Sequence, residues 1–369
     1  MKQMHVMYVI WSLGLGGAEQ VVLHLARGLD KNRFRVSVCC LNDEGEFAPV
    51  LQQSGVKVFA LHKQKGIDLA VVSKLRRIFK EQEVDLVHAH LWGGNFWGRI
   101  AAHKEHIPVV VTEHNVDVWK TPIHFFLDRM LYRKADKFLC VSDSVRQFYS
   151  GHLHVRKECL NVLYNGIETD ENVIPSGAGL QLKSEFNIGE NTFVFSIIGR
   201  LVPQKGHSFF LDVFKRIAAR HPDVKVLIIG DGPLKQALTE QIIQNGLKDK
   251  VVLTGLRKDV PAILSITDAV VLPSFREGLP MTLLEGMVRE KVVVASAVGG
   301  TPELVTDGVD GFLFEAGNAG QLEEKLNFVL SGGENLSNIR AAARRKVCEQ
   351  FSLSNMIRQH EAVYQEMIK

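Results

Sequence analysis

The chain has 369 residues, 46% hydrophobic and 23% charged, and a formal net charge of +3. A chain of this length exceeds the size at which one core stops growing, so we expect two globular domains and exclude disordered and fibrous classes. The small charge, with no interleaved basic and aromatic stripe, excludes a nucleic-acid footprint. Five cysteines without a C-x-x-C pair, no cleavable signal pattern and no long apolar run predict a cytoplasmic protein.

Short β-branched runs alternate with helical periodicity along the whole chain, which predicts parallel sheets built from βαβ units. The first series of expected strands covers residues 6–10, 35–41, 56–61, 85–88, 108–112, 137–141 and 161–163, and the second covers 193–198, 224–229, 251–253, 269–272, 292–295 and 312–314. Residues 171–182 contain proline and glycine without periodicity and are expected to be a linker. We therefore predict an α/β fold of two Rossmann-like parallel-sheet domains, residues 1–175 and 183–351, facing a central cleft where such sheets bind ligands.

A glycine-rich turn follows the first expected strand and runs into a helix, with the sequence G-L-G-G-A-E from Gly14 to Glu19. Glycines at this place let backbone amides approach an anion or a sugar closely, so Gly16 and Gly17 are candidate binding residues. Glu19 stands where the dinucleotide fingerprint has its third glycine. A simple tight turn is an equal alternative.

Residues 69–80 place apolar side chains at helical spacing opposite cations. The pattern predicts either a packed helix with a solvated basic face or a helix that lies on a membrane surface. His88 and His90 suggest zinc, but no Cys, Asp or Glu cluster completes a metal site. His114 follows the expected strand 108–112, where it could hydrogen-bond a sugar hydroxyl or share charge with a substrate.

Four aromatic residues lie in loops expected at the same end of the first domain. Their rings could stack on a sugar or a lipid, or could belong to the core. They are Trp92, Phe96, Trp97 and Trp119.

The first strand of the second series leads into G-R-L-V-P-Q-K-G, which places Arg200 and Lys205 on one loop. A guanidinium and an ammonium at this spacing can neutralise a diphosphate, although a solvated loop is the alternative. No D-x-D occurs in the chain, so the usual carboxylate pair for a metal-bound sugar diphosphate is missing.

Glu277 and Glu285 flank a Gly-Leu-Pro turn that enters an apolar helical run. The backbone amides of three residues lie near the expected helix start, where a phosphate is favoured. These residues are Gly278, Leu279 and Met281. Glu277 would face the sugar and Glu285 the ribose diol, and the alternative is two surface glutamates beside a helix cap.

Two further turns after expected strands are the kind of backbone that contacts a nucleobase. They contain Gly230 in one turn and Gly255, Leu256 and Arg257 in the other.

Taken together, G-x-G-G-A-E, E-H-N, G-R-L-x-x-x-K-G and E-G-L-P-M-T-L-L-E resemble the family-four glycosyltransferases of the GT-B fold, in order and over nearly the whole chain. The resemblance implies transfer of a sugar from a nucleotide diphosphate donor with retention of configuration and without a divalent metal. It implies that Arg200 and Lys205 hold the diphosphate, Glu285 the ribose and Glu277 the transferred sugar. It also implies that residues 352–369 form a helix that crosses back onto the first domain.

The resemblance further places His114 near the transferred sugar, and Gly16 and Gly17 near the donor phosphate or the acceptor. A UDP-sugar is the favoured donor and GDP-mannose the alternative. The implied acceptor is a glycan or a lipid-linked molecule of cell-surface polysaccharide synthesis, with peripheral contact at the inner face of the membrane. A nucleotide-sugar epimerase or phosphorylase, an NAD-dependent dehydrogenase and a non-catalytic sugar-binding protein are the competing classes.

Overall fold

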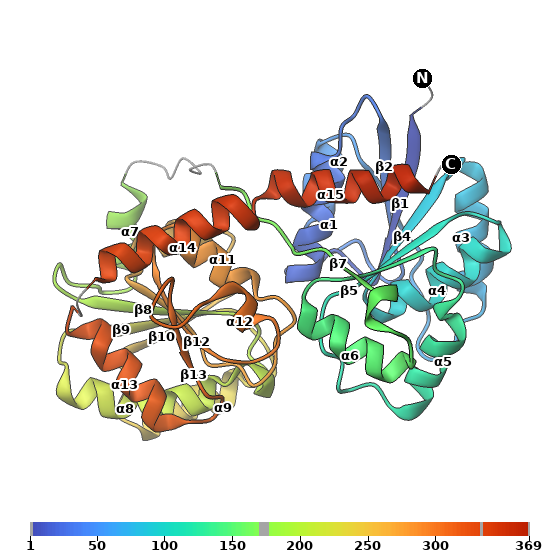
Figure 1. The fold of residues 1–369 in the computed structure, drawn as a ribbon. Coiled ribbons are helices and arrows are strands. Elements are labelled where there is room, and N and C mark those ends of the chain that lie inside the picture. The colour runs from blue at the N-terminus through green and yellow to red at the C-terminus, as the bar shows by residue number, and fades with distance from the viewer. Residues whose placement is uncertain (1–2, 170–176, 333–334, 368–369) are drawn as a thin grey trace. The chain divides into compact units, whose positions relative to one another are not determined.

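The computed structural model describes residues 3–169, 177–332 and 335–367, which form two compact units (Figure 1). The first unit comprises Met1–Gly166 with Leu353–Lys369, and the second comprises Ile167–Ser352. Each unit has one sheet in which every strand pair is parallel. The predicted α/β class with two parallel-sheet domains is confirmed.

The first unit alternates strands with helices. Its strands are β1 (Met4–Ile10), β2 (Phe34–Cys40), β3 (Lys57–Ala60), β4 (Leu86–His90), β5 (Val109–Glu113), β6 (Lys137–Cys140) and β7 (Asn161–Val162). Its helices are α1 (Gly17–Gly28), α2 (Ala48–Gln53), α3 (Ala70–Glu81), α4 (Leu91–Lys104), α5 (Pro122–Tyr132), α6 (Asp143–Leu153), the short 3-10 helix η1 (Lys157–Cys159) and α15 (Leu353–Glu366). Every residue of β1 is buried, so both faces of the sheet are covered there.

The second unit repeats this plan. Its strands are β8 (Phe193–Ile198), β9 (Val224–Ile229), β10 (Val251–Gly255), β11 (Ala269–Leu272), β12 (Val292–Ser296) and β13 (Phe312–Phe314). Its helices are α7 (Ala178–Glu185), η2 (Pro203–Lys205), α8 (His207–Arg220), α9 (Lys235–Gln244), α10 (Val260–Ser265), α11 (Met281–Val288), α12 (Thr301–Leu304), α13 (Ala319–Leu330) and α14 (Leu336–Gln350). Buried side chains of β8, β9, α8 and α13 share one hydrophobic core.

The strand order places the candidate loops of each unit. The first sheet runs β3-β2-β1-β4-β5-β6-β7 and the second β10-β9-β8-β11-β12-β13. The order reverses between β1 and β4, and between β8 and β11. Loops after such neighbouring strands diverge and leave a crevice at the carboxyl edge of the sheet, which is where open parallel sheets bind ligands.

The last helix, α15, packs on the first unit, as the predicted crossing helix requires. It contacts α1, and Glu361 accepts hydrogen bonds from the backbone N–H of Asp30 and the guanidinium of Arg33. The hydroxyl of Tyr364 is buried against Tyr8 at 3.2 Å and His88 at 2.6 Å. Residues more than 300 positions apart in the sequence therefore share one core.

The structure bears on two local expectations, the linker over residues 171–182 and the helix over residues 69–80. Part of the linker predicted over 171–182 lies outside the described residues, and its remainder forms the start of helix α7. In α3 the apolar face is buried at Val71, Leu75, Ile78 and Phe79. That face packs within its own unit, so α3 is a packed helix with a solvated basic face.

Candidate functional site

Two neighbouring strands of the second unit carry the predicted phosphate and sugar residues. β8 pairs with β11, the loop after β8 holds Arg200 and Lys205, and the loop after β11 holds Glu277. The ammonium of Lys205 donates to Glu277 Oε1 at 2.7 Å, and these side chains are 21% and 7% exposed. Arg200 is exposed. The structure thus joins residues 72 positions apart in one charged group.

Backbone contacts lock these two loops together. The N–H of Phe275 donates to the carbonyl of Gln204 at 2.8 Å, and the Gln204 side chain donates to the carbonyl of Arg276 at 2.8 Å. Gly206 has φ 69°, and a Cβ there would lie 1.9 Å from the carbonyl oxygen of Pro273. Only glycine fits both the conformation and the space, so the position of Lys205 depends on this close approach.

A third loop, after β12, closes on the Glu277 loop. Gly299 has φ 55°, and a Cβ there would lie 1.8 Å from the carbonyl oxygen of Glu277. The N–H of Gly300 donates to the carbonyl of Gly278 at 2.9 Å. The sequence analysis assigned no role to this loop. Two consecutive glycines directly after a buried strand were the available signal.

Helix α11 begins at Met281, with Pro280 as the residue before it. The predicted backbone donors Gly278, Leu279 and Met281 therefore surround the start of the helix, and the Leu279 and Met281 side chains are buried. Glu285 lies in the second turn and is half-buried. These positions agree with a bound phosphate at the helix start and a polar ligand group beside Glu285.

The predicted base-contacting turns are partly occupied by contacts of their own. The N–H of Gly230 donates to the carbonyl of Gly255 at 2.9 Å, so this amide is not available to a nucleobase. The guanidinium of Arg257 donates hydrogen bonds to the carboxylates of Asp259 and Glu185, and these bonds hold the pKa of Arg257 above its usual range. Leu256 is exposed.

Several polar groups at the same sheet edge are buried without a hydrogen-bond partner among the described residues. They are Ser274 Oγ, Thr282 Oγ1, Thr301 Oγ1 and both ring nitrogens of His207. His207 follows the Lys205 loop directly, and burial, helped by the Lys205 charge, lowers its pKa to about 4. Unmet polar groups are costly in a folded protein, and these four residues lie at the loops that a ligand would contact, while others lie in the first unit, among them His90, Asn95 and Arg99. The sequence analysis missed all four residues.

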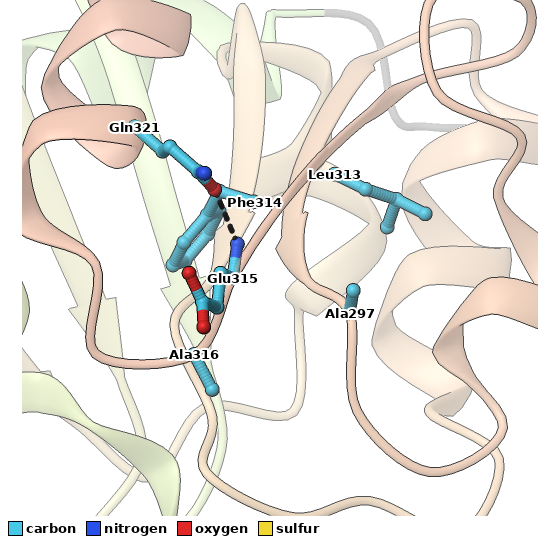
Figure 2. Close-up of a pocket in the computed structure, with 6 residues that line it drawn as sticks. All are labelled: Ala297, Leu313, Phe314, Glu315, Ala316 and Gln321. Atoms are coloured by element: carbon cyan, nitrogen blue, oxygen red, sulfur yellow. Dashed lines mark hydrogen bonds between the residues drawn. The ribbon is translucent and has the colours of Figure 1, made fainter.

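A separate hollow of about 470 Å³ lies beside β12 and β13 (Figure 2). Its described lining residues are Ala297, Leu313, Phe314, Glu315, Ala316 and Gln321. The side chain of Gln321 accepts a hydrogen bond from the N–H of Glu315 at 2.7 Å. None of the predicted donor residues belongs to this lining.

In the first unit the glycine-rich turn leads into α1, as predicted. Gly17 is the first residue of α1 and Gly16 the residue before it. A Cβ on Gly16 would lie 2.3 Å from Glu19 Oε2, so a side chain there would displace the Glu19 carboxylate. A helix start suits an anionic group, which is the role predicted for this turn, although the N–H of Gly16 already donates to the carbonyl of Gly14 at 3.1 Å.

His114 follows β5 and is buried against a second histidine. Its Nε2 lies 2.9 Å from Nδ1 of His90, the last residue of β4. Burial lowers the pKa of His114 to about 3, so the ring is neutral. A neutral ring can hydrogen-bond a sugar hydroxyl, and the role of His114 at the transferred sugar stays a prediction. The described residues contain no group of three or more His, Cys, Asp or Glu side chains placed to hold a metal ion.

Directly beside His114 lies a buried charged cluster that the sequence analysis missed. The Lys120 ammonium donates to Asp128 at 2.9 Å and lies 3.7 Å from Glu113 and 3.4 Å from Asp117. The hydroxyl of Tyr149 donates to Glu113 at 3.0 Å. Burial raises the pKa of Glu113 to about 7 despite the nearby ammonium. Burial alone lowers the pKa of Lys120, but the three carboxylates outweigh it and raise this pKa.

The Glu113 shift predicts a pH dependence of stability. An acid whose pKa is raised in the folded state binds more protons folded than unfolded between about pH 4.5 and about pH 7. The contribution of Glu113 to the free energy of unfolding is fully present below about pH 4.5 and is lost as the pH rises to about 7. We expect Glu113→Gln to remove this loss of stability. The melting temperature of the variant minus that of the wild type should therefore increase as the pH rises.

Comparing the wild type with Glu113→Gln separates the effect of Glu113 on stability from that of the buried histidines. Burial lowers the pKa of His88, His90, His114 and His360, so these groups contribute the opposite slope, equally in both proteins. Thermal melts across this pH range measure the difference, and parallel curves for wild type and variant would contradict the prediction.

The four aromatic residues of the first domain divide between the two predicted alternatives, a place in the core and a surface open to stacking. Trp97 is buried and belongs to the core, whereas Trp119 is exposed. Trp92 and Phe96 are half-buried and stack on each other at 5.4 Å. Trp119 lies edge-on to Trp92 at 6.0 Å, so a partly exposed aromatic group is present beside α5.

Two family models match the chain in succession. The model described as Glycosyltransferase Family 4 matches residues 15–171, and the model described as Glycosyl transferases group 1 matches residues 181–346.

Curated relatives match nearly full length. A UDP-Gal:alpha-D-GlcNAc-diphosphoundecaprenol alpha-1,3-galactosyltransferase of Escherichia coli is 26% identical over 369 residues, covering 96% of this chain and 95% of the relative. An N-acetyl-alpha-D-glucosaminyl L-malate synthase of Bacillus anthracis is 26% identical over 320 residues, covering 85% of this chain and 83% of the relative.

Solved structures share the fold at low identity. Anabaena Alr3699/HepE in complex with UDP has a TM-score of 0.85 and 24% identity, covering 98% of this chain and 100% of that chain. A glycosyltransferase from Rickettsia africae has a TM-score of 0.87 and 21% identity, covering 100% of both chains. At this identity the likeness carries the two-sheet fold alone.

Proposed function

The chain belongs to the family-four glycosyltransferases of the GT-B fold, and on that premise we propose that it transfers a sugar from a UDP-sugar to a glycan or lipid-linked acceptor, with retention of configuration and without a divalent metal. The observation that carries this proposal is the Lys205–Glu277 ion pair on neighbouring loops beside the start of α11, with Arg200 on the same loop as Lys205. Two cations and a helix start suit a diphosphate, and a carboxylate on the adjoining loop suits sugar hydroxyls.

The proposed chemistry relies on the leaving group. Negative charge grows on the departing diphosphate as the bond to the sugar breaks. Arg200 and Lys205 stabilise that charge, and preorganised charges of this kind supply a large part of many rate enhancements. In this proposal the diphosphate itself takes the proton of the acceptor hydroxyl. The neutral ring of His114 hydrogen-bonds the transferred sugar, and its lowered pKa makes it a poor base.

The choice of a UDP-sugar rests on relatives. The Escherichia coli relative has UDP-Gal in its name, and Anabaena Alr3699/HepE was solved with UDP. The name of the same relative includes a diphosphoundecaprenol acceptor, which supports a lipid-linked acceptor and peripheral membrane contact for this chain. GDP-mannose is the alternative donor, since the predicted base-contacting turns present mainly backbone. No helix of the described residues is long and apolar enough to cross a bilayer.

The donor proposal is tested with a panel of UDP-, GDP- and ADP-sugars in thermal-shift and hydrolysis measurements without added metal. We expect one donor to stabilise the protein and to be hydrolysed slowly. Glu285→Ala should abolish that stabilisation, because the second turn of α11 then lacks its ribose-binding carboxylate. Glu240→Ala, on the exposed side of α9, is the matched control and should keep it.

The outcomes separate the competing functions. Stabilisation by a GDP-sugar alone would replace the UDP assignment. Interconversion of the sugar on the nucleotide, without transfer, would favour an epimerase. Stabilisation that survives in Glu285→Ala would contradict the ribose role of Glu285.

A further inference from the structure

Helix α5 of the first unit exposes an apolar face. Ile123, Phe126 and Met130 are 65%, 59% and 62% exposed, and Trp119 in the preceding turn is 56% exposed. The three helical residues are spaced i, i+3 and i+7, which puts them on one side of the helix. We call these four residues the α5 ridge. Isolated exposed apolar residues are ordinary, but a continuous row along one helix marks an interaction surface.

The opposite side of α5 already has its packing partners. Leu131 and Asp128 are buried, and Asp128 is held by the buried cations Arg99 and Lys120 at 3.0 Å and 2.9 Å. The helix therefore stays folded without help from the ridge. The ridge is surplus to the packing of the first unit.

The exposed charges on the flank of the ridge are cations, and the carboxylate of Asp117, which accepts a hydrogen bond from the Trp119 indole at 3.1 Å, is 14% exposed and paired with the buried Lys120. Arg129 and Arg133 are exposed and lie one turn apart on the flank of the ridge. Asp128, the one acidic residue within α5, is buried and paired, so it does not offset them. A groove of about 730 Å³ adjoins the ridge between α5 and α6, which pack against each other (Figure 1).

The lining of the groove, like the ridge and its flank, combines apolar and cationic side chains. Its described lining includes Phe126, Phe148, Arg129 and His152, and none of its described lining residues is acidic. An apolar row with a tryptophan at one end and cations along its flank is the pattern of a helix lying in the boundary of an anionic bilayer. A water-facing helix has no physical reason to combine these features.

We propose that the α5 ridge docks the protein on an anionic lipid bilayer surface, with the ridge side chains in the headgroup and acyl boundary and Arg129 and Arg133 against lipid phosphates. Helix α3, in contrast, buries its apolar face, and the exposed Ile67 and Leu69 that precede it do not continue as a row along the helix. The proposal rests on the peripheral membrane contact proposed above and assigns that contact to a named surface. It concerns a surface whose docking requires neither donor nor acceptor.

The test is co-sedimentation of the full chain with phosphatidylcholine vesicles that contain phosphatidylglycerol, and with phosphatidylcholine vesicles alone. We expect binding to the anionic vesicles. The triple variant Ile123→Gln, Phe126→Gln, Met130→Gln should lose about a thousandfold in partitioning, because each buried apolar side chain contributes about tenfold or more. Arg129→Glu with Arg133→Glu should weaken binding mainly to the anionic vesicles.

Matched controls come from the second unit. Leu180 and Ile243 are 76% and 56% exposed, so Leu180→Gln with Ile243→Gln removes apolar surface elsewhere and should leave binding unchanged. Unchanged melting temperatures show that each variant is folded, and unchanged thermal shift by the donor shows that the donor site is intact.

Three results would overturn the proposal. They are equal vesicle binding by the triple variant and the wild type, no binding of the wild type to either vesicle, and a ridge-dependent dimer in analytical ultracentrifugation without vesicle binding. The last result would assign the ridge to a second copy of the chain. A donor that fails to bind would count against the proposed function and not against docking.

Discussion

Replacing Arg200 or Lys205 with alanine is expected to reduce turnover of the donor by about a hundredfold to a thousandfold, while the protein remains folded. Both side chains lie on the loop after β8, at the reversal of strand order, where a diphosphate would meet them. Their charges act most strongly on the leaving group, whose charge grows in the transition state. The loss should therefore appear in kcat more than in donor affinity.

The two variants differ in a second effect. Lys205 is paired with Glu277, whose side chain is 7% exposed, so Lys205→Ala also leaves a nearly buried carboxylate without its partner. We expect that variant alone to lose about 1–3 kcal/mol of stability. Arg200→Ala should melt like the wild type, because Arg200 is exposed.

Lys235→Ala is the matched control. Lys235 follows β9, is 52% exposed and pairs with Asp231, so it is a cation near the same sheet edge with no assigned role in turnover. Steady-state release of UDP from the donor measures all three variants. Near-normal turnover in both Arg200→Ala and Lys205→Ala would remove the leaving-group role from this loop.

Among the glycines of the donor loops, Gly299 is the position where an added methyl group is expected to be most disruptive. The added Cβ would lie 1.8 Å from the carbonyl oxygen of Glu277, and the residue has φ 55°. Because the clash is with backbone, no side chain can swing away, and the Glu277 loop itself has to shift. We expect a loss of about 3 kcal/mol or more of stability and about a hundredfold in turnover.

Gly308→Ala separates the clash from the conformation. Gly308 has φ 73°, but no heavy atom lies within 4 Å of an added Cβ. That variant should lose only the about 1–2 kcal/mol of the left-handed conformation and should keep its turnover. Thermal unfolding and donor hydrolysis measure both effects. Equal losses in the two variants would show that the contact with Glu277 is unimportant.

Most strands were readable from the sequence because they are short, largely buried runs rich in apolar and β-branched residues and bounded by polar turns. The predicted bounds of β8, β9, β11 and β13 agree with the structure. Helix α7 was missed because Gly177 and Gly179 weaken the helical signal, and packing against α10 outweighs that propensity. Local pattern alone therefore locates most elements and fails where a tertiary contact stabilises a poor helix sequence.

The candidate site shows the same division. Arg200, Lys205, Glu277 and Glu285 were found because charged residues stand out directly after apolar strands. Three features of the site could not be read from the sequence, because each depends on which strands are neighbours. They are the Lys205–Glu277 pair, the close approach of Gly299 to the Glu277 loop and the buried polar groups without a partner. Strand order is set by long-range pairing, which has no signature in local periodicity.

The sequence by itself determined the alternation of strands and helices, the two-domain parallel-sheet class and the loops that carry the charged motifs, because hydrophobic periodicity and turn chemistry are local properties. Only the tertiary structure decided which amphipathic helix has a partner. The sequence singled out α3, yet α3 buries its apolar face, while α5 carries apolar residues on two sides and leaves one exposed. Burial depends on the neighbours that the fold supplies, so the chain reveals it only once it is folded.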